Sequence, residues 1–600
     1  MLLIFTGLLI VRVAVLHFSD RIVLKSGPKI ENLRRGYIKD SAGNILAISI
    51  ETRSLFANPE KIEDPKKTAL QLAEILQVRP EYIYSRLTLP RRFIWLRRKL
   101  PEATASRIEA LKINGLGFKK EFKRMYPYET LASHIIGFTD IDNNGLSGIE
   151  FSQNDYLSGT ADVENADINS LNYGFNINLT IDKNIQYIAE KYLNEAVTIH
   201  NAERGAVVIT DVRNARILAC AVNPAYNSNY YFRYTGKQRA SYSVVQSFEP
   251  GSTMKIFSAA AWLESGRADM KKLYHGSGEI DIYDVTIRST SVHGWITMFD
   301  AVRLSCNVSV IRAMQEIRKD ELDAMLRKFG FGSKVCRDFP GESPGLLRPV
   351  NEWSGISKAS ISIGQEMSAT SLQLAAAFGA VANGGVYIQP SLIDSIELNN
   401  GHKIQQFYPK SKGRIISRQN GEILRQMMKA VVETGTGKNA AVPGYEVAGK
   451  TGTAQISSST GGYLEGEYTA SFGGFAPYDD PLIAVVVVLD RPKGQVHGGE
   501  VAAPVFSKVV SEVLPLMGAG ATSVTNIDPR EISARSPHFD GEHMPDLYGY
   551  RLSELTPLFE HIQKKYAVQF EFSGSGVVTS QSPEAGTVLQ KKQKIELHFR

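Results

Sequence analysis

The chain has 600 residues, of which 43% are hydrophobic and 22% are charged, and this composition excludes a disordered or fibrous protein. The length allows about four domains. Lys and Arg number 68 against 62 Asp and Glu, an excess too small to indicate a nucleic-acid-binding protein. The three cysteines, Cys220, Cys306 and Cys336, are too few for a disulfide framework and fit no zinc site, so we expect neither a metal nor a cofactor.

Residues 1–18 are apolar except for three positions. A membrane-spanning helix needs about 20 apolar residues. No small-residue cleavage site follows, so we interpret 1–18 as an uncleaved transmembrane anchor, with a buried core helix as the alternative. Basic residues from Arg21 to Arg35 follow the segment, which by the positive-inside rule places the remainder in the cytoplasm. A basic stretch ahead of this numbering would allow the opposite orientation, with the remainder of the chain outside the cytoplasm.

Residues 31–170 are mixed in character and predict a separate N-terminal domain. Short strands are expected at 37–38 and 45–47, on either side of a turn at 41–44. The basic and aromatic stretch 90–98 predicts a strand with one buried and one solvated face, not a nucleic-acid contact.

A second domain is predicted over 176–517. Asp182 can cap a helix whose apolar residues recur every three or four positions, and 206–209 and 217–222 predict a β-hairpin. Much later, 482–489 predicts another strand, and Pro504 suits the first turn of a final helix. With a long helical insertion between them, these elements indicate an α+β domain with an antiparallel sheet.

The C-terminal part divides in two. Residues 518–542 are rich in Gly, Ser, Thr and Pro and predict a linker. Residues 543–600 predict a small α+β module, with a helix over 553–566 and an alternating strand at the end.

Ser252 and Lys255 stand three residues apart at the expected start of a helix, which places both side chains on one face. A serine needs a nearby base to act as a nucleophile, and a lysine can be that base when burial and positive charge lower its pKa. A serine at a helix start also offers its backbone N–H to an oxyanion. Alone the motif is weak, because Ser26 and Lys29 match it too.

Two further motifs follow in order: Ser305-Cys306-Asn307, and Lys450-Thr451-Gly452-Thr453, the latter beside an expected strand. The order of the three motifs is that of β-lactamases and penicillin-binding proteins. Residues 444–451 also fit a phosphate-binding loop. We reject that alternative, because 445–448 looks like strand and no helix follows Lys450.

Three neighbouring features receive structural interpretations. Residues 434–438 are expected to be a glycine loop that ends a helix. Residues 497–499 are expected to form a turn, with a role at the edge of the site as the alternative. Cys306 is interpreted as a packing residue.

The chain resembles class B penicillin-binding proteins, the membrane-anchored peptidoglycan transpeptidases, over essentially its whole length. The stretches that carry the resemblance are 35–40, 43–47, 134–138, 148–150, 179–182, 339–342, 364–366, 382–385 and 448–455, while 544–549 and 581–586 resemble a PASTA module. The resemblance implies an α+β multidomain protein: the anchor, an elongated pedestal domain over 31–170, a transpeptidase domain whose sheet is flanked by helices and an all-helical subdomain, and the PASTA-like module.

The resemblance also implies roles for the motif residues. Ser252 would attack the penultimate D-Ala carbonyl of a stem peptide and Lys255 would take its proton, while Ser305 and Lys450 would relay a proton to the leaving amine. The substrate-binding residues would be Asn307 for the amide, Thr451 and Thr453 for the terminal carboxylate, and Gly452 within the same motif. The backbone N–H groups of Ser252 and Thr453 would form the oxyanion hole. β-Lactams would acylate Ser252.

Rival functions remain open. A β-lactamase needs a carboxylate for deacylation, and no Glu-x-x-Leu-Asn follows Asn307. A D,D-carboxypeptidase differs only in using water as acceptor, and a non-catalytic scaffold would not need the complete motif set. We expect a septal enzyme, with elongation and sporulation as alternatives, held in the cytoplasmic membrane with its catalytic domain outside. Expected partners are lipid-linked precursor, division proteins and a membrane glycosyltransferase that supplies glycan polymerisation.

Overall fold

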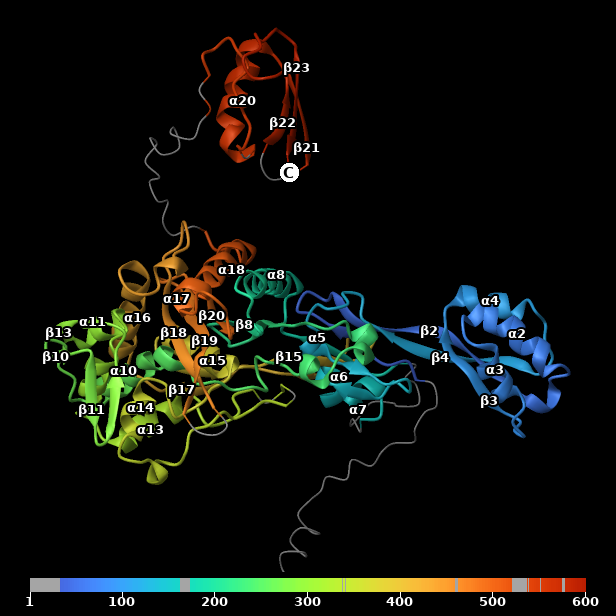
Figure 1. The fold of residues 1–600 in the computed structure, drawn as a ribbon, viewed down its shortest axis with the longest axis horizontal. Helices are drawn as coiled ribbons and strands as arrows, with labels where there is room; N and C mark the ends of the chain where they lie inside the picture. The colour runs from blue at the N-terminus through green and yellow to red at the C-terminus, as the bar shows by residue number, and fades with distance from the viewer. Residues whose placement is uncertain are drawn as a thin grey trace, which may run out of the picture. The chain divides into compact units, whose positions relative to one another are not determined.

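The computed structural model describes residues 33–161, 173–336, 338–339, 341–458, 462–520, 537, 539–550, 552–574 and 578–599. The chain forms two compact units, Met1–Gly520 and Ala521–Arg600 (Figure 1). The expected anchor, and most of the expected linker, lie outside the described residues. Among the residues described, no helix combines the length and apolar character that crossing a membrane requires.

A seven-stranded sheet organises the N-terminal part of the first unit. Its order is β16-β15-β7-β1-β2-β3, with β4 also paired to β2. The strands are β1 (Ile38–Lys39), β2 (Ile45–Ala57), β3 (Ile94–Leu100), β4 (Leu116–Met125), β7 (Asn176–Leu179), β15 (Ile393–Glu397) and β16 (Lys403–Gln406). The turn predicted before β2 is confirmed, since the Asp40 carboxylate accepts the backbone N–H groups of Ala42 and Asn44.

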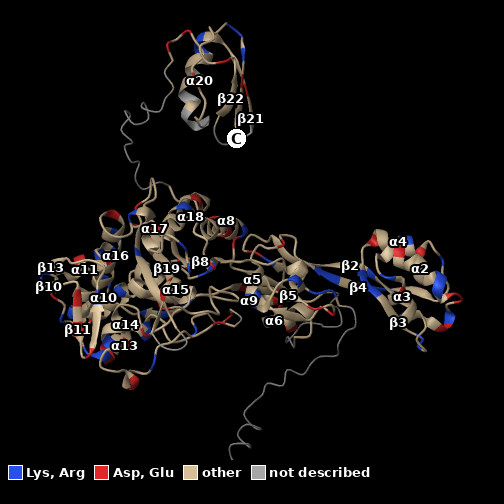
Figure 2. Cartoon of the chain, in the orientation of Figure 1, with Lys and Arg blue, Asp and Glu red and all other residues tan. Residues whose placement is uncertain are grey.

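Three helices cover the far end of β2, β3 and β4: α2 (Pro65–Leu76), α3 (Pro80–Leu87) and α4 (Glu102–Glu109). They share a core that includes Leu55, Leu72, Ile83 and Leu96. The strand predicted within 90–98 is confirmed as β3, with Leu96 buried. Basic and acidic residues are interspersed along the described chain, and β4 carries several basic residues (Figure 2).

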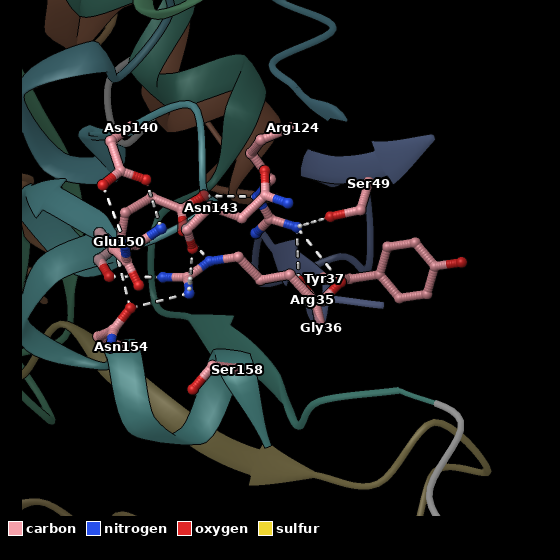
Figure 3. Close-up of polar contacts among 12 residues, drawn as sticks. Arg35, Gly36, Tyr37, Ser49, Arg124, Asp140, Asn143, Glu150, Asn154 and Ser158 are labelled. Atoms are coloured by element: carbon pink, nitrogen blue, oxygen red, sulfur yellow. Dashed lines mark hydrogen bonds and ion pairs between the residues drawn. The ribbon is translucent and has the colours of Figure 1, made fainter. Parts of the chain in front are cut away.

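Five short elements pack against the start of the described chain and this sheet. They are α5 (Ser133–Ile136), β5 (Phe138–Thr139), β6 (Gly145–Ser147), α6 (Gly148–Ser152) and α7 (Asn154–Ser158). Between them and β1, β2 and β4 lies a buried cluster in which Arg35 and Arg124 both bind Glu150 (Figure 3).

A five-stranded antiparallel sheet forms the centre of the second predicted domain, 176–517. Its strand order is β18-β19-β20-β8-β9. Its strands are β18 (Ala448–Ser457), β19 (Tyr463–Ala476), β20 (Ile483–Asp490), β8 (Arg204–Asp211) and β9 (Ile217–Asn223). The predicted hairpin and the predicted strand at 482–489 are therefore confirmed. β20 is apolar from Ile483 to Leu489, and both of its faces are buried: Val485 and Val487 lie in one core and Val486 and Val488 in the other.

Helices cover both faces of this sheet. The helix predicted after Asp182 is α8 (Lys183–Ile199), and the Asp182 carboxylate accepts the N–H groups of its first turn. It lies on one face with α18 (Ala503–Leu516), the helix predicted at Pro504. The other face carries α15 (Ser371–Ala382).

The long insertion between β9 and β18 is mainly helical. It contains α9 (Gly236–Arg239), α10 (Lys255–Glu264), α11 (Met298–Arg303), α12 (Asn307–Met314), α13 (Lys319–Lys328), α14 (Ser357–Ser362), α15 and α16 (Arg418–Glu433). It also holds two-stranded sheets: β10 (Leu273–Gly276) with β13 (Gly294–Thr297), β11 (Glu279–Ile282) with β12 (Val285–Arg288), and β14 (Val386–Gln389) with β17 (Lys410–Arg414). The expected all-helical subdomain therefore includes strands, because 273–297 has alternating β-branched residues separated by turns.

The C-terminal unit is a small α+β module, as predicted. Helix α20 (Leu552–Tyr566) lies against a sheet of order β21-β23-β22, and Leu555 and Ile562 share its core with Ile595 and Leu597. The strands are β21 (Gln569–Gly574), β22 (Val578–Ser582) and β23 (Lys594–Phe599).

Candidate active site

Ser252 lies in a tight turn, Gly251–Met254, that leads directly into α10, so the predicted helix start is confirmed. The side chain of Ser252 is half-buried. Gly251 has a φ of +56°, and a Cβ there would lie 2.9 Å from the carbonyl oxygen of Thr453. Only glycine combines this backbone conformation with so close an approach, so the turn packs tightly against β18.

Lys255, in the first turn of α10, is fully buried. Its Nζ donates to the carbonyl oxygen of Ser305 at 2.6 Å and lies 3.2 Å from the Ser305 Oγ. Burial lowers the pKa of Lys255 to about 7, because a charged ammonium loses its hydration in the interior. The neutral amine, which can accept a proton, is therefore abundant near neutral pH.

Ser305 occupies the bend between α11 and α12, where its φ is +61°. The buried Lys450 reaches it from β18 and places its Nζ 3.0 Å from the Ser305 Oγ. Burial, and then the nearby charge of Lys255, hold the pKa of Lys450 well below its usual range. Two amines therefore converge on one hydroxyl, and the three sequence motifs meet at this point.

The Lys-Thr-Gly-Thr motif lies on β18, an edge strand of the central sheet. A Cβ at Gly452 would lie 2.9 Å from the carbonyl oxygen of Pro250, so this position also needs glycine. The Thr451 hydroxyl is 2.8 Å from that of Thr436, and the Thr453 hydroxyl accepts the N–H of Gly498 at 3.1 Å.

One of these contacts involves a residue that sequence reasoning did not place at the site, and the other a residue to which it gave only an alternative role there. Thr436 comes from the glycine loop that follows α16, and Gly498 begins the short helix α17 (Gly498–Val501). The prediction of a turn at 497–499 is wrong, while the alternative role beside the site agrees with the Gly498 contact. The repeated Thr-Gly pairs at 434–437 are the sequence signal that could have marked Thr436.

Asn307 and Cys306 lie beside Ser305 with different surroundings. The Asn307 amide donates to the carbonyl oxygen of Arg288 at 2.8 Å, so it binds the end of β12 rather than either lysine. Cys306 is buried, with its Sγ 3.4 Å from the Ser309 hydroxyl, which confirms the packing interpretation.

The phosphate-loop alternative fails on geometry. Lys450 and Thr451 are part of a strand and are followed by more strand, where such a loop needs the start of a helix. The expected strand at 445–448 begins only at Ala448, because Tyr445 forms a bridge with Val442 across a turn.

Comparisons with known proteins agree with this geometry. Residues 205–511 match the family model described as penicillin binding protein transpeptidase domain, 30–179 match the penicillin-binding protein dimerisation domain, and 542–600 match the PASTA domain. The stage V sporulation protein D of Bacillus subtilis is 31% identical and covers 94% of this chain and 90% of its own.

Two further proteins are similar over most of the chain. The probable peptidoglycan D,D-transpeptidase PenA of Neisseria meningitidis is 34% identical, covering 81% of this chain and 85% of its own. The crystal structure of penicillin binding protein 3 from Mycobacterium tuberculosis, complexed with aztreonam, matches with a TM-score of 0.66 and 28% identity, over 82% of this chain and 98% of that one. With a family model that spans half of its length and a relative aligned almost end to end, the chain belongs to the penicillin-binding protein transpeptidases.

Proposed function

We propose that this protein is a peptidoglycan D,D-transpeptidase that works through a Ser252 acyl-enzyme. The observation that carries the proposal is the convergence of Lys255 and Lys450 on the Ser305 hydroxyl, next to the turn that bears Ser252. The family and the name of the relative PenA support the reaction class, and the aztreonam complex of the similar structure supports binding of β-lactams.

In the acylation step, the neutral amine of Lys255 takes the proton of the Ser252 hydroxyl. The Ser252 Oγ then forms a bond to the penultimate D-Ala carbonyl carbon of the stem peptide. The backbone N–H groups of Ser252 and Thr453 stabilise the oxyanion, an effect worth about 2.7–4 kcal/mol for each donor. As the bond to the terminal D-Ala breaks, Ser305 and Lys450 pass a proton to the leaving amine.

Substrate is held by the residues around β18. Thr451 and Thr453 bind the terminal carboxylate beside the Lys450 amine, and Gly452 keeps the strand close to the nucleophile turn. The Oδ1 of Asn307 accepts the N–H of the substrate amide, while its Nδ2 donates to the carbonyl oxygen of Arg288. An amine of a second stem peptide then attacks the acyl-enzyme and forms the crosslink. β-Lactams acylate the same hydroxyl.

Product analysis tests the acceptor. Incubating the full-length protein with stem-peptide donors and an amine-bearing acceptor peptide is expected to release D-Ala and yield crosslinked dimers, measured by mass spectrometry. Trimmed monomers alone would make the protein a D,D-carboxypeptidase. Absence of both products, together with absence of acylation by penicillin, would make it a scaffold.

We further propose that the protein acts at the division septum, anchored through residues 1–18 with its catalytic domain on the outer side of the cytoplasmic membrane. The apolar composition of 1–18 supports the anchor. Lipid-linked precursor, a membrane glycosyltransferase and division proteins are the proposed partners. A fluorescent fusion is expected at midcell in dividing cells; signal along the side walls, or only in sporulating cells, would reject the septal role.

A further inference from the structure

A cavity of about 140 Å³ opens beside the nucleophile turn, where β18 continues beyond Thr453. The lining residues used below are Glu249, Gln455, Ser457, Arg204 and Arg491. Glu249 stands three residues before Ser252, and Gln455 and Ser457 follow the Lys-Thr-Gly-Thr motif on β18. The cavity is therefore lined by the segments that precede Ser252 and follow the Lys-Thr-Gly-Thr motif.

The cationic side chains of the cavity already have partners. The guanidinium of Arg204 lies 2.8 Å from the Asp490 carboxylate, and that of Arg491 lies 2.6 Å from the Glu203 carboxylate. These two cations therefore leave no positive charge to balance a further carboxylate in the cavity.

Glu249 is that further carboxylate. Its Oε1 accepts the backbone N–H of Glu366 at 3.2 Å, and the Tyr463 hydroxyl is the other hydrogen-bonding group at the carboxylate. Among the described residues, no cationic side chain pairs with it. The charged neighbour that acts on Glu249 is Glu366, which is negative. Burial first, and then Glu366, raise the pKa of Glu249. A cation bound here would supply the charge pairing that the described residues do not provide.

The direction of the substrate brings such a cation to Glu249. With the terminal carboxylate at Thr451 and Thr453, the peptide before the reacting carbonyl extends along β18 toward Gln455 and Ser457. A stem peptide that crosslinks through a side-chain amine carries a primary ammonium in its diamino residue. We propose that Glu249 binds this ammonium group of the stem peptide. The proposal rests on the proposed transpeptidase function.

The first arm of the test concerns the donor. Two thioester donors of the form Nα-acetyl-L-Lys-D-Ala, one with a free side-chain amine and one with that amine acetylated, report acylation through thiol release. The full-length protein is expected to prefer the free amine about tenfold, as for a charge-assisted hydrogen bond. Glu249→Gln is expected to reduce the ratio of the two rates to about one. Glu465→Gln, which neutralises an exposed carboxylate on β19, is expected to keep the wild-type ratio.

The second arm concerns the acceptor. With the acetylated donor, partition of the acyl-enzyme between an amine acceptor and water is measured against acceptor concentration. If Glu249→Gln leaves the donor rate ratio unchanged and raises only the acceptor concentration at which half of the acyl-enzyme is crosslinked, the bound ammonium belongs to the acceptor. The proposal is overturned if wild-type protein acylates with both donors at the same rate and its acyl-enzyme does not partition to the amine acceptor. It is also overturned if Glu249→Gln keeps both the wild-type rate ratio and the wild-type dependence on acceptor concentration. A wild-type protein acylated by neither thioester nor penicillin would instead reject the transpeptidase function.

Discussion

Ser252→Ala is expected to abolish labelling of the protein by a fluorescent penicillin. The variant lacks the only atom in the nucleophile turn that we propose to form the acyl bond, and losing the nucleophile of a comparable serine enzyme costs roughly 10⁶ in kcat. Labelling is read from fluorescence of the denatured full-length protein after electrophoresis, so that only covalent adducts are counted.

A matched control separates the nucleophile from serines that merely resemble it. Ser26→Ala removes the serine of the chance Ser-x-x-Lys match and is expected to label as wild type does. Because Ser252 is half-buried and its hydroxyl lacks a large packing role, Ser252→Ala should leave the unfolding midpoint close to that of wild type. Labelling that survives in the Ser252→Ala protein would overturn the assignment.

Local elements of the fold were predictable because their signals lie in short windows. Asp182 with the apolar spacing after it specified α8, and the hairpin of β8 and β9 followed from two apolar runs joined by a short polar connection. The apolar run of β20 predicted a strand. Its burial on both faces, however, depends on helices from distant parts of the chain.

The assembly of the candidate site was predictable only through the resemblance. No window of the sequence shows that Lys255 and Lys450 approach one hydroxyl, because that contact depends on packing between α10, β18 and the bend at Ser305. Thr436 escaped prediction for the same reason, because it joins the site through a hydrogen bond to Thr451 on another element.

The structure shows a physical role for two of the stretches that carried the family resemblance, 35–40 and 148–150. Arg35 belongs to the first of them and Glu150 to the second, and the two side chains meet with Arg124 in the interior (Figure 3). The Arg35 Nε lies 2.6 Å from one carboxylate oxygen of Glu150, and the Arg124 Nε lies 2.6 Å from the other. Arg124 also donates to the carbonyl oxygen of Gly36, so the cluster ties the start of the described chain to β4.

Glu150→Gln is expected to destabilise the N-terminal part of the protein by about 3–5 kcal/mol, because it leaves two buried guanidinium groups without a counter-charge. All three side chains are at most 2% exposed, so water cannot replace the lost carboxylate. A domain has about 5–15 kcal/mol of stability in total, so the loss is a large part of it. Chemical denaturation of the full-length protein, followed through probes placed on β2 and β4, measures the change.

The same cluster predicts how stability depends on pH. Burial alone would raise the pKa of Glu150, but Arg124 and Arg35 outweigh it and hold that pKa below its usual value. A carboxylate whose pKa is lower in the folded state contributes stability above the unfolded pKa of about 4.3, and loses it as the pH falls through the folded value. Wild type is therefore expected to lose stability in acid more steeply than Glu150→Gln. Glu51→Gln is the control. Glu51 lies on β2, where its exposed carboxylate pairs with Lys120, so the substitution makes the same chemical change at the surface. It should follow wild type at every pH, and an equal loss in both variants would reject the cluster as the cause.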